Sequence, residues 1–171
     1  MITKYCLKAK FAGIENELYF EVDESEFTRL KERFLEISRA EEAISFTMSD
    51  GSATIIACKS IETLHFVSES SLEEFPALES IKDADCVVKY RLFGRRDPEY
   101  LEVDSPSTAV EFYDRIREAL ETDFAEDAGL FFAVVDEDGK DFYFNRDTLL
   151  YVVVPKKVFD EGCKQLGKKR A

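Results

Sequence analysis

The sequence predicts an α+β fold in which a ββαβββ module occurs twice in tandem. Residues 4–23 and 85–104 align without a gap at an offset of 81, and six of the aligned positions are identical. The correspondence continues in order, at an offset of 82 through a helical pattern and at 88 from Asp50-Gly51 to Asp138-Gly139. Because both changes of offset fall where loops are expected, we interpret the pattern as a tandem duplication.

The duplication divides the chain into two repeats, an acidic linker and a C-terminal segment. We place the first repeat at 1–67, the linker at 68–84, the second repeat at 85–155, and a short helix with a basic tail at 156–171. We expect an antiparallel sheet with one packed helix in each repeat, and a pseudo-twofold arrangement of the two copies. The pattern leaves open whether the copies form two domains or one continuous sheet. A further segment, 121–129, is predicted to be a surface insertion.

Alternating apolar and polar residues predict the first hairpin of each repeat. In the first copy the apolar residues are Tyr5, Leu7, Ala9 and Phe11, then Leu18, Phe20 and Val22. Folding this hairpin about residues 13–16 places Lys8 opposite Glu21, and Lys10 opposite Tyr19. The equivalent turn in the second copy places Lys89 opposite Glu102 and Arg91 opposite Tyr100.

A helix is predicted after each hairpin. Asp23 and Glu26 have the spacing of a capping box, and Ser105 precedes a proline that suits the first helical position. Apolar residues recur three and four positions apart in both segments. These residues are Phe27, Leu30, Phe34 and Ile37 in the first copy and Phe112, Ile116 and either Ala119 or Leu120 in the second.

The second hairpin and a closing strand complete each repeat. Asp50-Gly51 is typical of a two-residue turn. In the second copy such a turn would place Asp136 opposite Asp141, so we expect a three-residue loop at 137–139 with Gly139 in the left-handed region. That loop pairs Val134 with Phe142 and Phe132 with Phe144, and the closing strands are expected at 61–67 and 149–154.

Composition excludes several functional classes. The net charge of −13 opposes attraction to nucleic acid and to anionic membranes, and the chain has no apolar run long enough to span a bilayer. The four cysteines show neither the paired spacing of a metal or redox motif nor the density of a disulfide scaffold. A reduced, cytoplasmic protein is the expected setting.

The sequence assigns no catalytic residue, metal site or cofactor. The single histidine, His65, lies in a predicted strand without an accompanying nucleophile motif, which favours a structural role. The acidic run 136–141 does not fit a calcium loop, because Val134 and Asn145 would occupy two of the principal ligand positions. Phosphate-binding glycine motifs are also absent from the sequence.

Six basic residues are the candidate ligand-binding residues of this acidic chain. If the two copies converge, they would form one anion-binding strip, and they are Lys8, Lys10, Lys89, Arg91, Arg95 and Arg96. The alternative, which we favour, is that each lysine balances a cross-strand glutamate.

These observations favour a non-catalytic protein-interaction module, such as an adaptor, assembly factor, inhibitor or immunity-type protein, because the acidic surface suits a basic protein partner. A binder of a small anionic ligand in the cleft between the repeats is one alternative. An enzyme with carboxylates at the repeat interface is another, and nucleic-acid mimicry has only charge in its favour. The second hairpin carries four phenylalanines, Phe131, Phe132, Phe142 and Phe144. They favour contact between modules or between chains, so a homodimer is one arrangement that would bury them.

Overall fold

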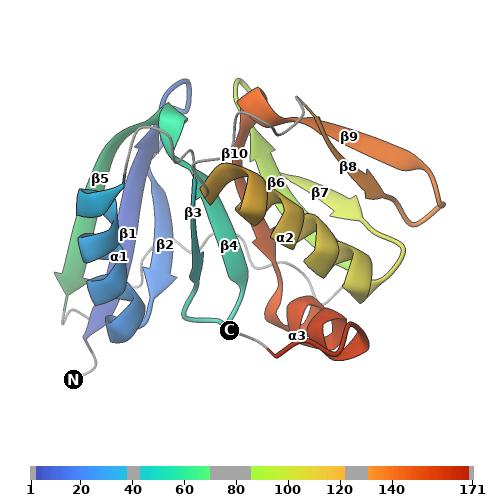
Figure 1. Ribbon diagram of the computed structural model, residues 1–171. Helices are drawn as coiled ribbons and strands as arrows, with labels where there is room; N and C mark the ends of the chain where they lie inside the picture. Colours follow the sequence, from blue (N-terminus) through green and yellow to red (C-terminus); the bar gives the residue numbers. More distant parts are fainter. Residues whose placement is uncertain (1–2, 38–42, 70–85, 122–130, 170–171) are drawn as a thin grey trace.

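The computed structural model describes residues 3–37, 43–69, 86–121 and 131–169, and these ranges form antiparallel sheets with three α-helices (Figure 1). The α+β fold class is therefore confirmed. Two strands, a helix, two strands, a 3₁₀ turn and a strand follow one another twice along the chain, before the last helix. Most of the predicted linker and insertion, and Arg170 of the basic tail, lie outside the described residues.

The N-terminal part of the chain forms a three-stranded sheet in the order β2-β1-β5. Its strands are β1 (Lys4–Phe11), β2 (Leu18–Val22) and β5 (Ile61–Glu69). Helix α1 (Glu24–Glu36) packs on one face, where Phe27 lies 5.1 Å from the ring of Tyr5 and 5.5 Å from that of Phe66. The apolar stripe predicted for this helix thus covers the inward residues of the sheet.

The second sheet takes strands from both predicted repeats, in the order β3-β4-β10-β6-β7. These strands are β3 (Ala43–Thr47), β4 (Ala53–Ala57), β10 (Leu149–Val154), β6 (Val87–Leu92) and β7 (Glu99–Glu102). Two further strands, β8 (Phe131–Val135) and β9 (Asp141–Asn145), form a separate hairpin. The turns between β4 and β5 and between β9 and β10 are 3₁₀ helices, Cys58–Ser60 and Arg146–Thr148.

The strand order does not have the pseudo-twofold arrangement predicted from the sequence. Strand β4 pairs with β10. A twofold relation between the halves would also pair β9 with β5, but these two strands lie in different sheets, at opposite sides of the molecule (Figure 1). Among the described strands, the two halves are therefore joined through one pairing only. Which strands pair across the halves depends on contacts that are distant in sequence, so the local pattern did not determine it.

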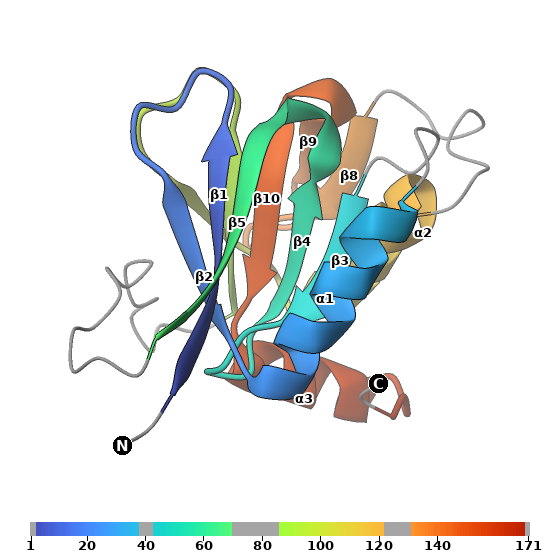
Figure 2. The same cartoon turned by 90° about the vertical axis from the view of Figure 1, so that its left-hand side faces the viewer.

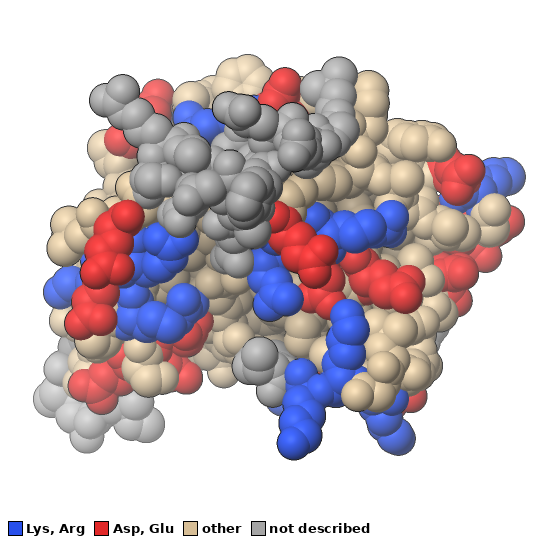
Figure 3. Space-filling view, in the orientation of Figure 1, with Lys and Arg blue, Asp and Glu red and all other residues tan. Residues whose placement is uncertain are grey.

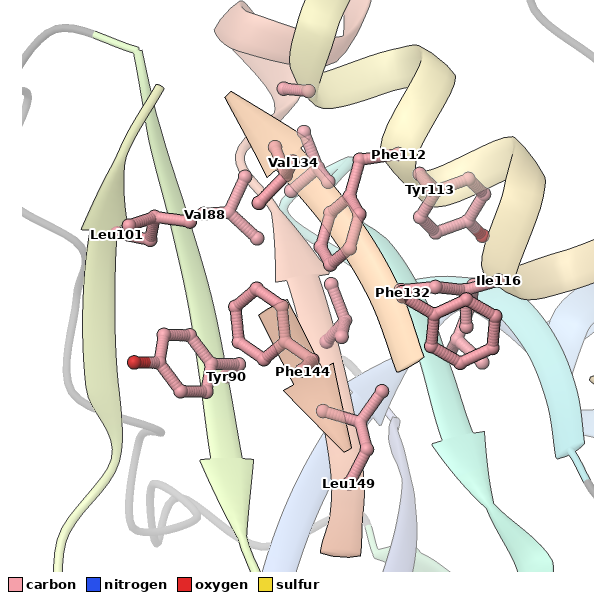
Figure 4. Packing of buried hydrophobic residues seen from close by; sticks show 14 of the residues in the cluster. Val88, Tyr90, Leu101, Phe112, Tyr113, Ile116, Phe132, Val134, Phe144 and Leu149 are labelled. Atoms are coloured by element: carbon pink, nitrogen blue, oxygen red, sulfur yellow. The ribbon is translucent and has the colours of Figure 1, made fainter. Parts of the chain in front are cut away.

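Two hydrophobic clusters fill the molecule, and β10 contributes to both. In the first, helix α2 (Pro106–Glu121) packs on the sheet, and Phe144 lies between Tyr90 and Phe112 at ring distances of 4.6 and 5.1 Å (Figure 4). In the second, Tyr151 of β10 lies 5.8 Å from the ring of Phe20. The strand that joins the two halves is thus buried on both of its faces.

Helix α3 (Lys156–Gln165) packs against α2 through a close approach at Gly162. A Cβ atom at this position would meet the carbonyl oxygen of Pro106 and would lie 2.5 Å from Cγ2 of Val110. Since such distances are not tolerated, only glycine allows the two helices to lie this close. The last helix is therefore fixed to the first turns of α2.

The first hairpin of each half has a longer loop than predicted, so the predicted register was wrong by two residues. Lys8 lies opposite Tyr19 rather than Glu21, and Lys89 lies opposite Tyr100 rather than Glu102. The last pair of the first hairpin is Ala9 with Leu18, so residues 10–17 connect the paired segments and the turn is centred one residue earlier than predicted, with Gly13 at φ 76°. Because a shift of two residues keeps every side chain on the same face, the predicted core residues are unaffected.

The second hairpins share one loop type. The predicted loop at 137–139 is confirmed, since β8 and β9 pair in the register expected for it. The predicted two-residue turn at Asp50-Gly51 is wrong: the amide of Met48 donates to the carbonyl of Ser52 at 3.0 Å, which leaves a loop of three residues. Gly51 has φ 85°, which is the left-handed conformation that this loop requires at its last position.

Candidate functional surfaces

The basic residues of the first hairpin interact with acceptors of that same hairpin. Lys8 lies 2.7 Å from the carboxylate of Glu17 and 5.4 Å from the ring centroid of Tyr19. Hydrogen bonding to Glu17 raises the pKa of Lys8. Lys10 donates to the carbonyl oxygens of Ile14 and, at 2.8 Å, of Glu15. Lys8 therefore balances a glutamate of its own hairpin, although the partner is Glu17 and not Glu21.

The basic residues of the second hairpin are arranged in a similar way. Lys89 is 2% exposed, and its Nζ lies 5.8 Å from the ring centroid of Tyr100. Arg91 donates to the carbonyl oxygen of Arg96, as Lys10 does to that of Glu15, and Arg95 lies 3.9 Å from Glu99. The guanidinium of Arg91 thus serves to hold the loop that follows its strand.

The loops of the two first hairpins lie side by side (Figure 2). A Cβ atom on Gly13 would be 3.1 Å from the ring of Phe93, so the backbone of one loop contacts a side chain of the other. Strands β1 and β6, which carry Lys8, Lys10, Lys89 and Arg91, therefore end at neighbouring loops, and Arg95 and Arg96 lie in the second of these loops. That these residues bind an anion remains a prediction, because the interactions described above direct several of them to their own hairpins.

A groove of about 650 Å³ lies between α1, α2, α3 and the edge strand β3. Acidic and basic side chains are intermixed on this face (Figure 3). Asp114 pairs with Lys168 at 2.7 Å and with Arg117 at 3.3 Å, and hydrogen bonding to Asp114 raises the pKa of Lys168. The described charges of the groove thus largely neutralise one another, which gives no assembled acid–base pair.

One ion pair of the groove covers the free edge of β3. Arg29 lies 2.7 Å from Glu26, one turn away on α1. Glu26 also accepts from the amide of Thr47 at 2.9 Å, and Arg29 donates to the carbonyl of Ser45 at 2.9 Å. These contacts satisfy backbone groups that an incoming strand would otherwise use, so this edge is protected against β-pairing.

Titratable groups elsewhere in the part of the chain that the structure describes do not form a catalytic arrangement. Glu137 has a raised pKa because it shares a hydrogen bond with Glu102, at an exposed turn outside the groove. Burial raises the pKa of the Cys6 thiol to about 12, which opposes the reactive thiolate form. His65 is exposed on β5. Within the described residues, no three His, Cys, Asp or Glu side chains are placed to hold a metal ion.

The largest exposed aromatic feature of the described strands is one face of the β8–β9 hairpin. Phe131 is 54% exposed and Tyr143 is 60% exposed, and their rings form an edge-to-face pair at 6.5 Å. The opposite face carries Phe132 and Phe144, which are buried in the core under α2. Sequence reasoning named the phenylalanines but did not include Tyr143, although the period-two alternation of β9 places it on the outer face with Phe131.

Comparison of the chain with protein-family models, curated proteins and solved structures gives no match. Among the described helices, none has the length and apolar character needed to cross a membrane. The surfaces of this chain itself therefore provide the evidence about its function.

Proposed function

We propose that this chain is a non-catalytic protein-interaction module of the adaptor, assembly-factor, inhibitor or immunity type. In this proposal it consists of two copies of one ββαβββ unit and binds a protein partner through Phe131 and Tyr143. All four cysteines are free, which is compatible with the reduced cytoplasm as its place of action.

Recurring backbone hydrogen bonds support the proposed duplication. Six bonds outside the regular elements of the described residues recur in the second half at the offsets found in the sequence; two lie at the start of α1 and in the Gly51 turn, and the other four involve loop residues. In the first half they are Ala12 N to Ser60 O (2.8 Å), Ile14 N to Phe11 O (3.2 Å), Met48 N to Ser52 O (3.0 Å) and Ser49 N to Glu21 O (2.8 Å). In the second half they are Phe93 N to Thr148 O (2.7 Å), Arg95 N to Leu92 O (3.2 Å), Asp136 N to Lys140 O (2.9 Å) and Glu137 N to Glu102 O (3.1 Å).

The helix caps give the same support. Asp23 accepts from the amide of Glu26 at 2.9 Å, and Ser105 accepts from the amide of Thr108 at 3.3 Å. Both pairs are related by the offset of 82 that the helical patterns show. Because loop and cap geometry is not required by an α+β fold in general, its recurrence favours a common origin of the two halves.

The observation that carries the proposal is the different burial of one face in the two halves. At the offset of 88, Ala43 corresponds to Phe131 and Ile55 to Tyr143. Ala43 and Ile55 are 0% and 1% exposed and pack in the cluster that contains α2. Phe131 and Tyr143, in contrast, are more than half exposed. A face that is covered by a neighbouring unit in one half is thus aromatic and uncovered in the other, as expected for a docking surface.

A pull-down at low salt compares the parent with a variant that carries both Phe131→Lys and Tyr143→Lys. The matched control carries Phe93→Lys and Tyr100→Lys, which replace two other exposed aromatic residues and add the same charge. We expect the parent and the control to retain one near-stoichiometric protein that the first variant loses. Equal retention by all three proteins, or by none, would contradict the proposal.

The alternatives have less support from the described residues. The anion-binding hypothesis requires basic groups that are available to a ligand, whereas Lys8, Lys10 and Arg91 interact with their own hairpins. The enzyme hypothesis requires carboxylates with raised pKa values in a pocket, whereas the raised pKa of Glu137 belongs to an exposed turn.

A further inference from the structure

We propose that copies of this chain associate head to tail, with strand β9 of one molecule adding to strand β5 of the next. The β8–β9 hairpin would lie against α1 of the neighbour. This inference rests on the proposed function and names the partner of the same aromatic face as a second copy of the chain.

The strand pairing that joins the two halves within one molecule shows how two molecules would pair. Strand β4 pairs with β10 in antiparallel orientation. At the offset of 88, the counterpart of β4 is β9 and the counterpart of β10 is β5. In the described part of the chain, β9 pairs only with β8, and β5 pairs only with β1. Each molecule therefore carries one unused edge of each kind, on opposite sides (Figure 1).

The register of the intermolecular pairing follows from the intramolecular one. Between β10 and β4, Val152 lies opposite Ile55. Transferring this pair at the offset of 88 places Leu64 of one molecule opposite Tyr143 of the other. The same transfer places Phe66 opposite Asp141. Because side chains alternate along a strand, this register directs Leu64 and Tyr143 to the side of the sheet that α1 covers.

The surface next to β5 is apolar, as an aromatic partner requires. Leu35 on α1 is 89% exposed, although it is a large hydrophobic residue. Its counterpart at the offset of 82 is Arg117, which lines the groove between α2 and β3. Phe34, Leu64 and Phe66 are only partly buried beside it. Where the first half presents small residues to α2, the second half would present Phe131 and Tyr143 to this surface.

The contact should be reversible, because one side of it is more polar than the internal junction. On β10, Tyr151 and Val153 face the second hydrophobic cluster. Their counterparts on β5 are Thr63 and His65, both exposed. Since less apolar area is buried there, we expect an association that depends on protein concentration.

The two contact surfaces differ, so the interface is heterologous. Such interfaces form closed rings when the rotation between molecules closes and open chains when it does not. Closed rings and open chains share one requirement. Each contact needs an intact β9 surface on one molecule and an intact β5 surface on its neighbour.

Sedimentation velocity on mixed variants tests this requirement. The donor variant carries Phe131→Lys and Tyr143→Lys, and the acceptor variant carries Leu35→Lys and His65→Lys. We expect the parent, and the Phe93→Lys/Tyr100→Lys control, to shift to larger species as concentration rises. Each surface variant alone should stay monomeric, because each lacks one half of the interface. A mixture of the two should form a one-to-one heterodimer and nothing larger.

A monomeric parent at its highest soluble concentration, or a mixture that forms no heterodimer, would overturn the inference. If the monomeric parent still retains a different protein through Phe131 and Tyr143, the proposed function stands and only the self-association is wrong.

Cysteine cross-linking provides a second measurement that does not depend on the lysine variants. Leu64→Cys on one molecule should form a disulfide with Tyr143→Cys on another. Ser68→Cys, about 13 Å further along β5, should not. Equal cross-linking of the two positions would also overturn the inference.

Discussion

Strands β4 and β10 differ sharply from β9 and β5, although the proposed duplication gives them corresponding positions. Every residue of β4 and β10 is buried, whereas β9 buries only Phe144 and residues 61–68 of β5 are all partly or fully exposed. Their sequences differ accordingly: ATIIA and LLYVVV are nearly continuous apolar runs, but DFYFN and IETLHFVSE are mixed. A strand that is packed on both faces has no polar face, as in β4 and β10, which contribute to both hydrophobic clusters, so the sequence of each strand reflects its surroundings.

The first prediction, with the largest effect, breaks the internal junction. Ile55→Ala should lower the free energy of unfolding by about 2–5 kcal/mol, because it removes a fully buried side chain beside β10. The matched change Tyr143→Ala, at the corresponding position of β9, should alter it by less than about 0.5 kcal/mol. Urea unfolding at a low protein concentration measures both, and similar losses would contradict the difference between the two strands.

A second prediction concerns α2, which covers the junction, and α3, which packs on α2. Gly162→Ala should cost about 1–3 kcal/mol, because the added methyl group would overlap Pro106 and Val110. Glu161→Ala, on the exposed side of the same helix, is the control and should be close to neutral. If Gly162→Ala unfolds at the same urea concentration as the parent, the close approach of α2 and α3 does not contribute to the stability of the fold.

A third prediction tests the cap of α1, the helix beside the free edge of β5. Asp23→Ala should cost about 1 kcal/mol at neutral pH, because the helix loses its side-chain cap. Hydrogen bonding to the amide of Glu26 lowers the pKa of Asp23. The stabilisation by the cap is therefore fully present above pH 3.8, the ordinary pKa of an aspartate, and is lost as the pH falls through the lowered pKa of Asp23. Thermal unfolding of both proteins over this range should show their difference decreasing towards acid pH. A stability difference between the two proteins that does not change with pH would show that the ionised carboxylate of Asp23 does not stabilise the helix.

The smallest expected effect is at the turn next to β9. Hydrogen bonding to Glu102 raises the pKa of Glu137, so protonation of this pair favours the folded state. This stabilisation of the folded state is fully present below pH 4.5, the ordinary pKa of a glutamate. It is lost as the pH rises through the raised pKa of Glu137. Glu137→Gln should therefore raise the melting temperature slightly at neutral pH but not in acid. Asp138→Asn in the same loop is the control, and an equal rise there would indicate a general charge effect.

The sequence predicted the local structure better than the long-range arrangement. Alternation located the strands, and the repulsion between Asp136 and Asp141 correctly selected the three-residue loop of the second hairpin. At Asp50-Gly51 a two-residue turn would pair Ser49 with Ser52, so no repulsion opposed it and the dipeptide predicted the wrong turn. The register of the first hairpins was wrong because loop length does not follow from alternation alone.

The candidate surfaces were harder to predict, for physical reasons. The groove contains Arg29, Arg117 and Lys168, which are brought together only by the packing of three helices that are distant in sequence. The aromatic face could have been found from the alternation in β9, but not its exposure, since that depends on whether a neighbouring strand and helix cover it. The pairing of β4 with β10 shows what covers the corresponding face in the first half.

Hydrogen exchange measured at low and high protein concentration tests most directly whether β9 and β5 are unused counterparts of the internal junction. We expect the amides of β4 and β10 to be protected at both concentrations, because their pairing lies within one molecule. The amides on the free edges of β9 and β5, which are not bonded to β8 or β1, should exchange rapidly at low concentration and become protected together at high concentration. Protection of β9 and β5 that does not change with concentration would contradict head-to-tail association of this chain.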